Sequence, residues 1–163
     1  MSNLLELERL RVQAEIYSGK DAGERNKLGQ FATPSKLAIQ ILRHAKKLLN
    51  GTPKVKFLDP AIGSGSFYSA LLETFEAKRI SEARGYEIDH AFANAATELW
   101  GDSGLQVIPK DFTLEEPRPE YNLIISNPPY VRHHHLTASC KTRLKNIVAQ
   151  ELGLEVSGLT GLY

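Results

Sequence analysis

Four short apolar runs are each followed by residues that could bind a ligand. The segments that follow them are 59–65 (DPAIGSG), 87–89 (EID), 111–112 (DF) and 127–130 (NPPY). If the four runs are parallel strands, their carboxyl ends lie along one edge of a sheet, and open α/β sheets bind ligands at that edge. The order of these segments therefore predicts one site built from four strand ends.

Two glycines, Gly63 and Gly65, allow the first segment to turn tightly and to approach a ligand with its backbone. The segment lacks the third glycine of a dinucleotide fingerprint, because Tyr68 stands at that position. It also lacks the Gly-Lys-Ser/Thr of a P-loop. A loop of this kind also holds pyrophosphates, so the neighbouring charges must identify the ligand.

Three carboxylates, those of Asp59, Glu87 and Asp111, stand at successive strand ends. They would repel a di- or triphosphate, whereas they suit a ligand with a sulfonium, an ammonium and two ribose hydroxyls. S-Adenosylmethionine carries all of these groups. Each acid alone is more typical of a solvated strand end or a helix cap, but the three together indicate a ligand site.

The fourth segment suits an exocyclic amine on a heteroaromatic ring, which is a poor nucleophile because its lone pair is delocalised. The Asn127 amide oxygen and the Pro128 carbonyl could each accept one N–H and stabilise the positive charge that grows on the nitrogen. The prolines fix φ and hold that carbonyl rigidly. Tyr130 offers a face for a planar base, a contact worth roughly 1–3 kcal/mol. Alone this segment would be a proline-rich turn, but after the other three it predicts methyl transfer to an amine.

The elements that must position these residues alternate between strand and helix. Helical spacing predicts helices over 67–80 and 91–100, a loop is expected over 113–120, and apolar runs predict strands over 55–58, 84–88, 105–108 and 121–126. Strands joined by crossover helices form a parallel sheet with helices on both faces. The predicted fold class is therefore α/β, with a doubly wound, Rossmann-like sheet.

Further helices are predicted ahead of the sheet. Near-helical spacing of apolar residues predicts a helix over 3–17, and a polar loop follows over 18–30. A second helix is expected over 34–49, with Thr33 as its N-cap and Pro34 in its first turn.

The composition is typical of one soluble globular domain, with 163 residues of which 42% are hydrophobic and 24% charged. No apolar run approaches the roughly 20 residues that span a bilayer, and no signal-peptide pattern opens the chain. The single cysteine, Cys140, excludes an internal disulfide. We therefore expect no membrane contact and a cytoplasmic location.

Residues 51–120 carry seven Lys or Arg against twelve Asp or Glu, and this acidic centre suits a cationic ligand.

In combination, the four segments resemble those of the class I, S-adenosylmethionine-dependent amino-methyltransferases. Within that class they resemble the N6-adenine DNA methyltransferases of restriction–modification systems. Residues 29–34 (GQFATP), ahead of the glycine loop, are similar to that family's additional cofactor motif. This order of motifs looks like the gamma arrangement, and the matches cover residues 29–130.

The resemblance implies a role for each residue of the predicted site. Catalytic roles fall to Asn127 and Pro128, which would bind the target amine, and to Tyr130, which would stack on an adenine flipped out of double-stranded DNA. Attack would be a direct in-line displacement, and no metal role is implied. The implied cofactor contacts are Thr33 with the carboxylate, Asp59, Ala61, Gly63 and Gly65 with the methionine moiety, Glu87 with the ribose, Ile88 with the adenine ring, Asp111 with the adenine amine, and Phe112 beside it.

The length of the chain departs from the family. A class I sheet has seven strands, and the 33 residues after Tyr130 are too few for three more strands with their crossovers. We therefore expect an N-terminal part of a longer protein, with helix and loop over 1–32 and a partial methyltransferase domain over 33–163. The later strands and the target-recognition domain would be missing. A restriction endonuclease, separate from the parent protein or fused to it, is the expected partner.

Other interpretations stay open. RNA or a protein glutamine amide could replace DNA as the substrate of the same chemistry, and the chain alone could be an inactive cofactor- or DNA-binding fragment. An NAD- or nucleotide-binding enzyme is disfavoured by the three carboxylates and the missing glycine.

The segment after the fourth motif is basic. Residues 133–135 are consecutive histidines, but three adjacent side chains cannot converge on one metal ion, so we expect a polar loop there. No Asp or Glu occurs over 121–150. The cations of this segment could contact phosphates and are Arg132, Lys141, Arg143 and Lys145.

Overall fold

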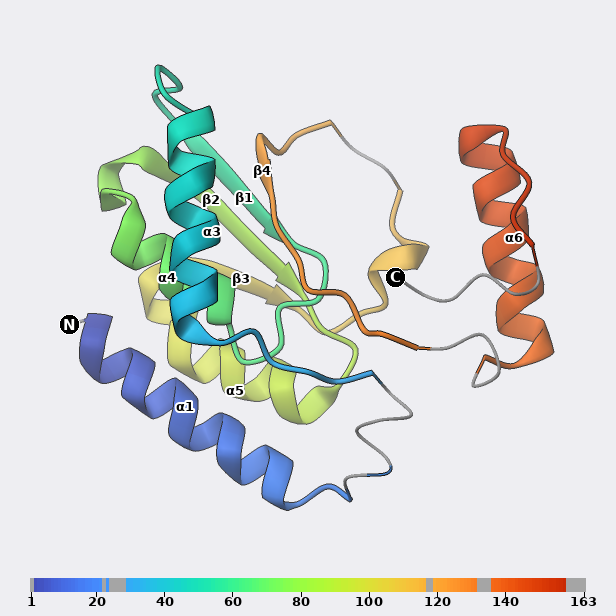
Figure 1. Cartoon of the computed structure of the whole chain (residues 1–163), viewed down its shortest axis with the longest axis horizontal. Coiled ribbons are helices and arrows are strands. Elements are labelled where there is room, and N and C mark those ends of the chain that lie inside the picture. Colours follow the sequence, from blue (N-terminus) through green and yellow to red (C-terminus); the bar gives the residue numbers. More distant parts are fainter. Residues whose placement is uncertain (1, 22, 24–28, 117–118, 132–135, 158–163) are drawn as a thin grey trace. The chain divides into compact units, whose positions relative to one another are not determined.

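The computed structural model describes residues 2–21, 23, 29–116, 119–131 and 136–157 (Figure 1). The chain forms two compact units. The sheet unit comprises Met1–Gly19 and Ala32–Asn127, and the second unit comprises Lys20–Phe31 and Pro128–Tyr163. The division between residues 32 and 33 that the sequence suggests stays a prediction.

The strands of the sheet unit form a parallel sheet in the order β3-β2-β1-β4. In the described residues the strands are β1 (Val55–Asp59), β2 (Ile80–Tyr86), β3 (Leu105–Ile108) and β4 (Leu123–Ile124). The order reverses at β1, whose neighbours are β2 and β4, so a ligand is expected at the carboxyl end of β1. The α/β class expected from the sequence is confirmed.

The helix expected over 67–80 is shorter than predicted. α4 (Ser66–Thr74) ends because Phe75 adopts extended backbone angles, φ −105° and ψ 146°, and buries its ring in the core. The short 3-10 helix η1 (Ala77–Arg79) follows, and β2 begins at Ile80, four residues before the predicted start at Arg84.

The strand expected over 121–126 contains only two paired residues. At the start of β4 the Asn122 N–H donates to the Lys56 carbonyl (3.3 Å), and the Asn122 side chain adds two further hydrogen bonds to the backbone of β1 and the residue before it. Its Oδ1 accepts from the Lys56 N–H (2.9 Å), and its Nδ2 donates to the Lys54 carbonyl (2.9 Å). An amide side chain presents the same donor and acceptor as a peptide group, so it continues the pairing of β1 without extending β4.

The second predicted helix also begins later than expected. α3 (Ser35–Leu48) has Pro34 at its N-cap position, with ψ 136°, and the Pro34 carbonyl accepts from the Ala38 N–H (3.0 Å). Thr33 is therefore not the N-cap. A residue before proline is held extended, and Thr33 is buried with 7% of its surface exposed.

The remaining elements are α1 (Ser2–Ser18), α5 (His90–Trp100), α6 (Ala138–Leu152), η2 (Gly101–Ser103) and η3 (Phe112–Leu114). The predicted helices over 3–17 and 91–100 are confirmed. α6 was not predicted, although Thr137 caps it by accepting from the Cys140 N–H (3.2 Å) and Gly153 ends it at φ 65°. Among the described residues no helix is both long and apolar enough to cross a membrane.

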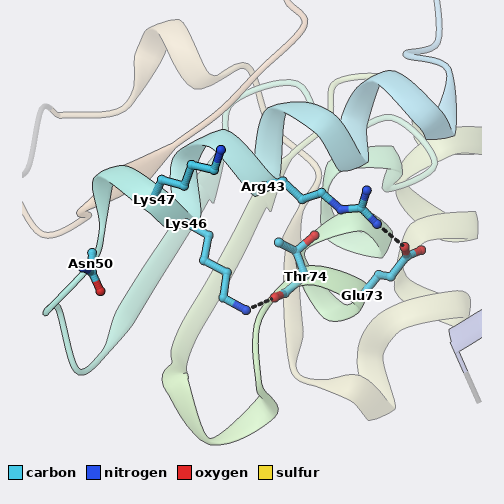
Figure 2. Close-up of a pocket in the computed structure, with 6 residues that line it drawn as sticks. All are labelled: Arg43, Lys46, Lys47, Asn50, Glu73 and Thr74. Atoms are coloured by element: carbon cyan, nitrogen blue, oxygen red, sulfur yellow. Dashed lines mark hydrogen bonds and ion pairs between the residues drawn. The ribbon is translucent and has the colours of Figure 1, made fainter.

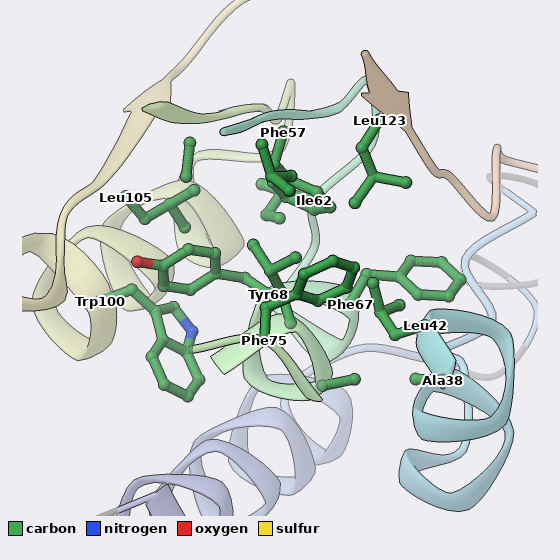
Figure 3. Close-up of a cluster of buried hydrophobic side chains, with 14 of the residues drawn as sticks. Ala38, Leu42, Phe57, Ile62, Phe67, Tyr68, Phe75, Trp100, Leu105 and Leu123 are labelled. Atoms are coloured by element: carbon green, nitrogen blue, oxygen red, sulfur yellow. The ribbon is translucent and has the colours of Figure 1, made fainter. Parts of the chain in front are cut away.

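The core fills the space between one face of the sheet and α3, α4 and α5 (Figure 3). The ring of Tyr68 packs edge-on against Trp100, with centroids 5.6 Å apart. Helices cover the face of the sheet that bears Phe57 and Leu105. A second layer of helices was expected on the other face. In the described strands, that face carries a row of ion pairs instead. The labelled core side chains are Ala38, Leu42, Phe57, Ile62, Phe67, Tyr68, Phe75, Trp100, Leu105 and Leu123.

Two leucines of α3 provide a test of this core. Leu42 has no exposed surface and Leu48 is 74% exposed. We predict that Leu42→Ala lowers the free energy of unfolding by about 2–5 kcal/mol, because it removes buried methyl groups and leaves a cavity. The matched change Leu48→Ala should stay within about 0.5 kcal/mol. Urea denaturation measures both, and equal effects would contradict the placement of α3.

Candidate functional site

The glycine loop lies between β1 and α4 and turns through two residues with positive φ. Gly63 has φ 55° and Gly65 has φ 91°. A Cβ at Gly65 would lie 2.3 Å from Trp100 Nε1, and that indole nitrogen donates to the Ser64 carbonyl (2.9 Å). Only glycine at position 65 lets the loop approach the indole ring so closely.

Glu87 fastens this loop to the end of β2. Its Oε2 accepts from the Gly63 N–H (2.9 Å), and its Oε1 accepts from the Asp89 N–H (2.8 Å). Burial raises the pKa of the Glu87 carboxyl, and the two backbone N–H donors oppose that rise. The first two predicted strand ends therefore meet at the Glu87 carboxylate.

Asp59 lies at the carboxyl end of β1 with 1% of its surface exposed. Its Oδ1 accepts from the Ala61 N–H (3.0 Å). Burial raises the pKa of the Asp59 carboxyl to about 7, and the nearby Glu87 carboxylate adds to the rise. The Ser126 hydroxyl lies close to this carboxylate, yet it is buried without a hydrogen bond of normal geometry in the described part of the chain. A buried acid beside an orphaned hydroxyl fits a ligand that brings its own positive charge and N–H donors.

Exposed apolar side chains flank these acids. Ile88 is 67% exposed and Phe112 is 36% exposed, with the Phe112 ring edge-on to Tyr86 at 5.1 Å. Asp111 caps η3 by accepting from the Thr113 N–H (3.0 Å) and hydroxyl (2.6 Å). The apolar surface suits a flat ring, and a bond from Asp111 to a ligand amine stays a prediction.

The fourth predicted segment crosses from one unit to the other. Asn127 is the last residue of the sheet unit, and Pro128 and Tyr130 belong to the second unit. Inside the second unit, the Tyr130 N–H donates to the Gly29 carbonyl (3.3 Å), and Tyr130 is 50% exposed. The start of the predicted cofactor motif at Gly29 therefore contacts the backbone of Tyr130, whereas Thr33 lies in the sheet unit.

Several residues around the loop were missed by the sequence analysis. Arg9 of α1 is fully buried and donates to the hydroxyls of Ser64 and Ser66 (3.0 Å each). The sequence gives little indication that Arg9 is buried, because the nearby Arg11 also has a glutamate three residues before it and is exposed. The serines on either side of Gly65 were a usable signal, since hydroxyls beside a buried loop need partners.

The basic segment of the sequence is only partly described. Lys141, Arg143 and Lys145 lie on α6, and Arg132 and residues 133–135 lie outside the described residues. Within the described ranges, no three His, Cys, Asp or Glu side chains gather as metal ligands would.

A pocket of about 580 Å³ lies at the opposite edge of the sheet unit, where α3 and α4 end (Figure 2). Its Lys46 ammonium donates to the Thr74 carbonyl (2.7 Å), and Arg43 pairs with Glu73 at 3.9 Å. These cations already pair with protein groups at helix ends. The pocket includes none of the predicted site residues, so we do not assign it to the ligand.

Known proteins resemble this chain in sequence and in fold. No protein-family model matches the chain. The chain is 31% identical over 140 residues to the type II methyltransferase M.AccI of Acinetobacter calcoaceticus. The matched region covers 85% of this chain and 24% of that protein. The chain thus spans about a quarter of the length of the curated relatives it matches.

Two solved structures share the fold. One is a protein of Listeria monocytogenes described as a class I S-adenosylmethionine-dependent methyltransferase, with a TM-score of 0.64, 16% identity, and coverage of 80% of this chain and 41% of that one. The other is the type IIG restriction endonuclease BpuSI, with a TM-score of 0.63, 19% identity, and coverage of 80% and 17%.

The sheet order, the glycine loop and these structures define the fold of a class I S-adenosylmethionine-dependent methyltransferase. By sequence, the chain is a relative of the type II methyltransferases, in agreement with the restriction–modification family that its motifs resemble.

Gly29 provides a test of the contact inside the second unit. A Cβ at Gly29 would lie 2.3 Å from Tyr130 N, and its φ of 61° disfavours any side chain. We predict that Gly29→Ala displaces Tyr130 and speeds exchange of its amide hydrogen, because the hydrogen bond to the Gly29 carbonyl is lost. Gly51→Ala is the control, since Gly51 also has positive φ but nothing lies within 4 Å of its Cβ position. Unchanged exchange at Tyr130 in Gly29→Ala would contradict the contact.

The buried acid at Asp59 predicts an unusual pH dependence of stability. Its pKa is raised from 3.8 to about 7 on folding, so the folded protein binds the extra proton. The free energy of unfolding should therefore fall as pH rises from about 4 to about 7, by up to roughly 4 kcal/mol for a shift of this size. Urea denaturation across this range measures the slope. In Asp59→Asn the contribution should vanish, and an identical slope in this variant would refute the assignment.

Proposed function

We propose that this chain forms the cofactor-binding part of a site-specific DNA adenine-N6 methyltransferase that uses S-adenosylmethionine. The observation that carries the proposal is the acidic cradle in which Glu87 fastens the glycine loop beside the buried carboxylate of Asp59. The relationship to type II methyltransferases supports the same activity.

The cradle suits the charges of the proposed cofactor. S-Adenosylmethionine supplies a methyl group activated by a sulfonium when it is bound. Asp59 would accept from the ammonium of the methionine moiety, and the backbone of Ala61–Gly65 would lie against that moiety. Thr33 would contact its carboxylate. Binding of a cation would draw the proton from Asp59, whose pKa of about 7 permits this near neutral pH.

The residues that follow β2 and β3 suit an adenosine. Glu87 would accept from the two ribose hydroxyls while it holds the Gly63 N–H. Ile88, which is 67% exposed, would lie against the adenine ring with Phe112 at its edge. Asp111 would accept from the adenine amine. Covering these apolar side chains would contribute about 25 cal/mol for each Å² removed from water.

Asn127 and Pro128 would prepare the acceptor amine. Both offer carbonyl oxygens, and two acceptors on one NH₂ favour the tetrahedral nitrogen that attacks. Tyr130 would stack on the base, and its 50% exposure leaves a ring face for that contact. Flipping the base costs a few kcal/mol, which stacking and the two hydrogen bonds must offset.

The proposed substrate is double-stranded DNA with a flipped adenine, and the proposed setting is the modification half of a restriction–modification system in the cytoplasm. The fold shared with the restriction endonuclease BpuSI supports a nuclease partner, separate or fused in the parent protein. The Lys and Arg side chains of α6 would contact phosphates, as the basic character of that segment suggests.

Asn127 provides the test of this function. We predict that Asn127→Ala in the full-length parent lowers methyl transfer to DNA by about 10²–10³-fold, since one of two preorganised groups that stabilise charge is lost. Calorimetry should find the affinity of this chain for S-adenosylmethionine unchanged by the substitution. Asn94→Ala, at an exposed position of α5, is the control. Transfer of labelled methyl and analysis of the modified base give the readout.

The position of the label decides between substrates. N6-methyladenine in DNA is the expected product. Label only on cytosine would refute the adenine assignment, and label only on RNA or on a protein glutamine would refute DNA as the substrate. Absence of S-adenosylmethionine binding by both this chain and the full-length parent would refute the cofactor.

A further inference from the structure

A buried arginine from the N-terminal helix holds the cofactor loop from its inner side. Arg9 lies on α1, has no exposed surface and directs its guanidinium toward the start of α4. It forms a two-pronged ion pair with Glu6 at 2.7 and 2.6 Å. Its other hydrogen bonds reach Gln13 (2.7 Å), Ser64 (3.0 Å), Ser66 (3.0 Å) and Ser35 (3.2 Å).

These partners come from three parts of the candidate site. Ser64 lies inside the glycine loop, Ser66 is the first residue of α4, and Ser35 is the first residue of α3, two positions after Thr33. The Ser35 hydroxyl also donates to Glu6 Oε1 (2.5 Å). One guanidinium therefore connects the loop proposed to hold the methionine moiety with the segment proposed to hold its carboxylate.

The same helix contains a second arginine with almost the same local surroundings. Arg11 pairs with Glu8 at i−3 and with Glu15 at i+4, as Arg9 pairs with Glu6 and contacts Gln13. The side chain of Arg11 is 56% exposed, and its hydrogen bonds to Glu8 and Glu15 lie inside α1. Local helix chemistry therefore does not account for the burial of Arg9, and the three serine contacts distinguish it.

Burying a guanidinium is costly, and apolar residues of the same size would stabilise the contact between α1 and the loop at least as well. The arginine adds directional hydrogen bonds, because its planar guanidinium holds several acceptors in one fixed geometry. Trp100 holds the Ser64 carbonyl and Glu87 holds the Gly63 N–H. With Arg9 on the Ser64 hydroxyl, the loop is fixed through groups from three different elements.

We propose that Arg9 is a positioning residue that sets the conformation of the cofactor loop, so that α1 is a working part of the cofactor site. The proposal rests on the proposed function for its effect on S-adenosylmethionine binding. It rests on the hydrogen-bond geometry alone for its effect on the loop.

The test removes the contacts without disturbing the ion pair. In the double variant Ser64→Ala, Ser66→Ala, the Arg9–Glu6 pair and the Arg9–Gln13 hydrogen bond remain, whereas the hydrogen bond from the Ser64 hydroxyl to Gln13 (3.0 Å) is lost with the Arg9 contacts. Hydrogen exchange at the Gly63 and Gly65 amides should become about tenfold faster, and affinity for S-adenosylmethionine should fall by about tenfold or more, the usual effect of losing hydrogen bonds to a charged group. Arg11→Gln is the control and should leave both measurements unchanged.

A second variant separates positioning from stability. Glu6→Leu combined with Arg9→Met replaces the buried ion pair by apolar groups of similar volume, which should preserve the melting temperature. Loop exchange should still be faster and cofactor affinity still lower. Wild-type exchange and affinity in both variants would overturn the proposal. If the wild-type chain and its parent bind no S-adenosylmethionine, the proposed function fails, and the exchange measurements still decide the role of Arg9.

Discussion

The site depends on one carboxylate that bridges two strand ends. Glu87 accepts from the Gly63 N–H and from the Asp89 N–H, so the loop after β1 and the turn after β2 cannot move independently. A glycine loop with two left-handed residues has little conformational preference of its own. Its shape must come from groups outside the loop, and Glu87, Trp100 and Arg9 supply them from three separate elements.

Fixing the loop in this way surrounds two acids with protein, because Asp59 is buried and Glu87 is half-buried. Asp59 and Glu87 both have raised pKa values because burial penalises their ionised forms. Neutral apolar residues would make a more stable fold. A cationic ligand reverses the balance, since its charge would make the ionised acids favourable. The chain therefore gives up stability at the position where a ligand would restore it, which is typical of binding sites.

The strands could be predicted from the sequence because hydrophobic period is a local property, and the ligand edge inferred from the strand ends stays a prediction. β3 and α5 were predicted to within one residue. The end of α4 was missed because the tertiary burial of Phe75 overrode helical spacing. Arg9 was missed for a related reason: its partners Ser64 and Ser66 are more than fifty positions away, and nothing in residues 3–17 distinguishes it from Arg11. Contacts between distant segments decide which charged residue is buried.

The amide of Asn122 also determines which residues of β4 face inward. β4 pairs with β1 through only two residues, so its own ladder is too short to resist slippage. A slip by one residue would turn Leu123, which is buried, to the outside and bring Ile124 into the core. It would also shift Asn127 by about 3.3 Å along the strand. The Asn122 side chain accepts from the Lys56 N–H and donates to the Lys54 carbonyl, and these two hydrogen bonds oppose a slip in register. A side chain five residues upstream thereby sets how far the amide of Asn127 extends beyond the end of the sheet.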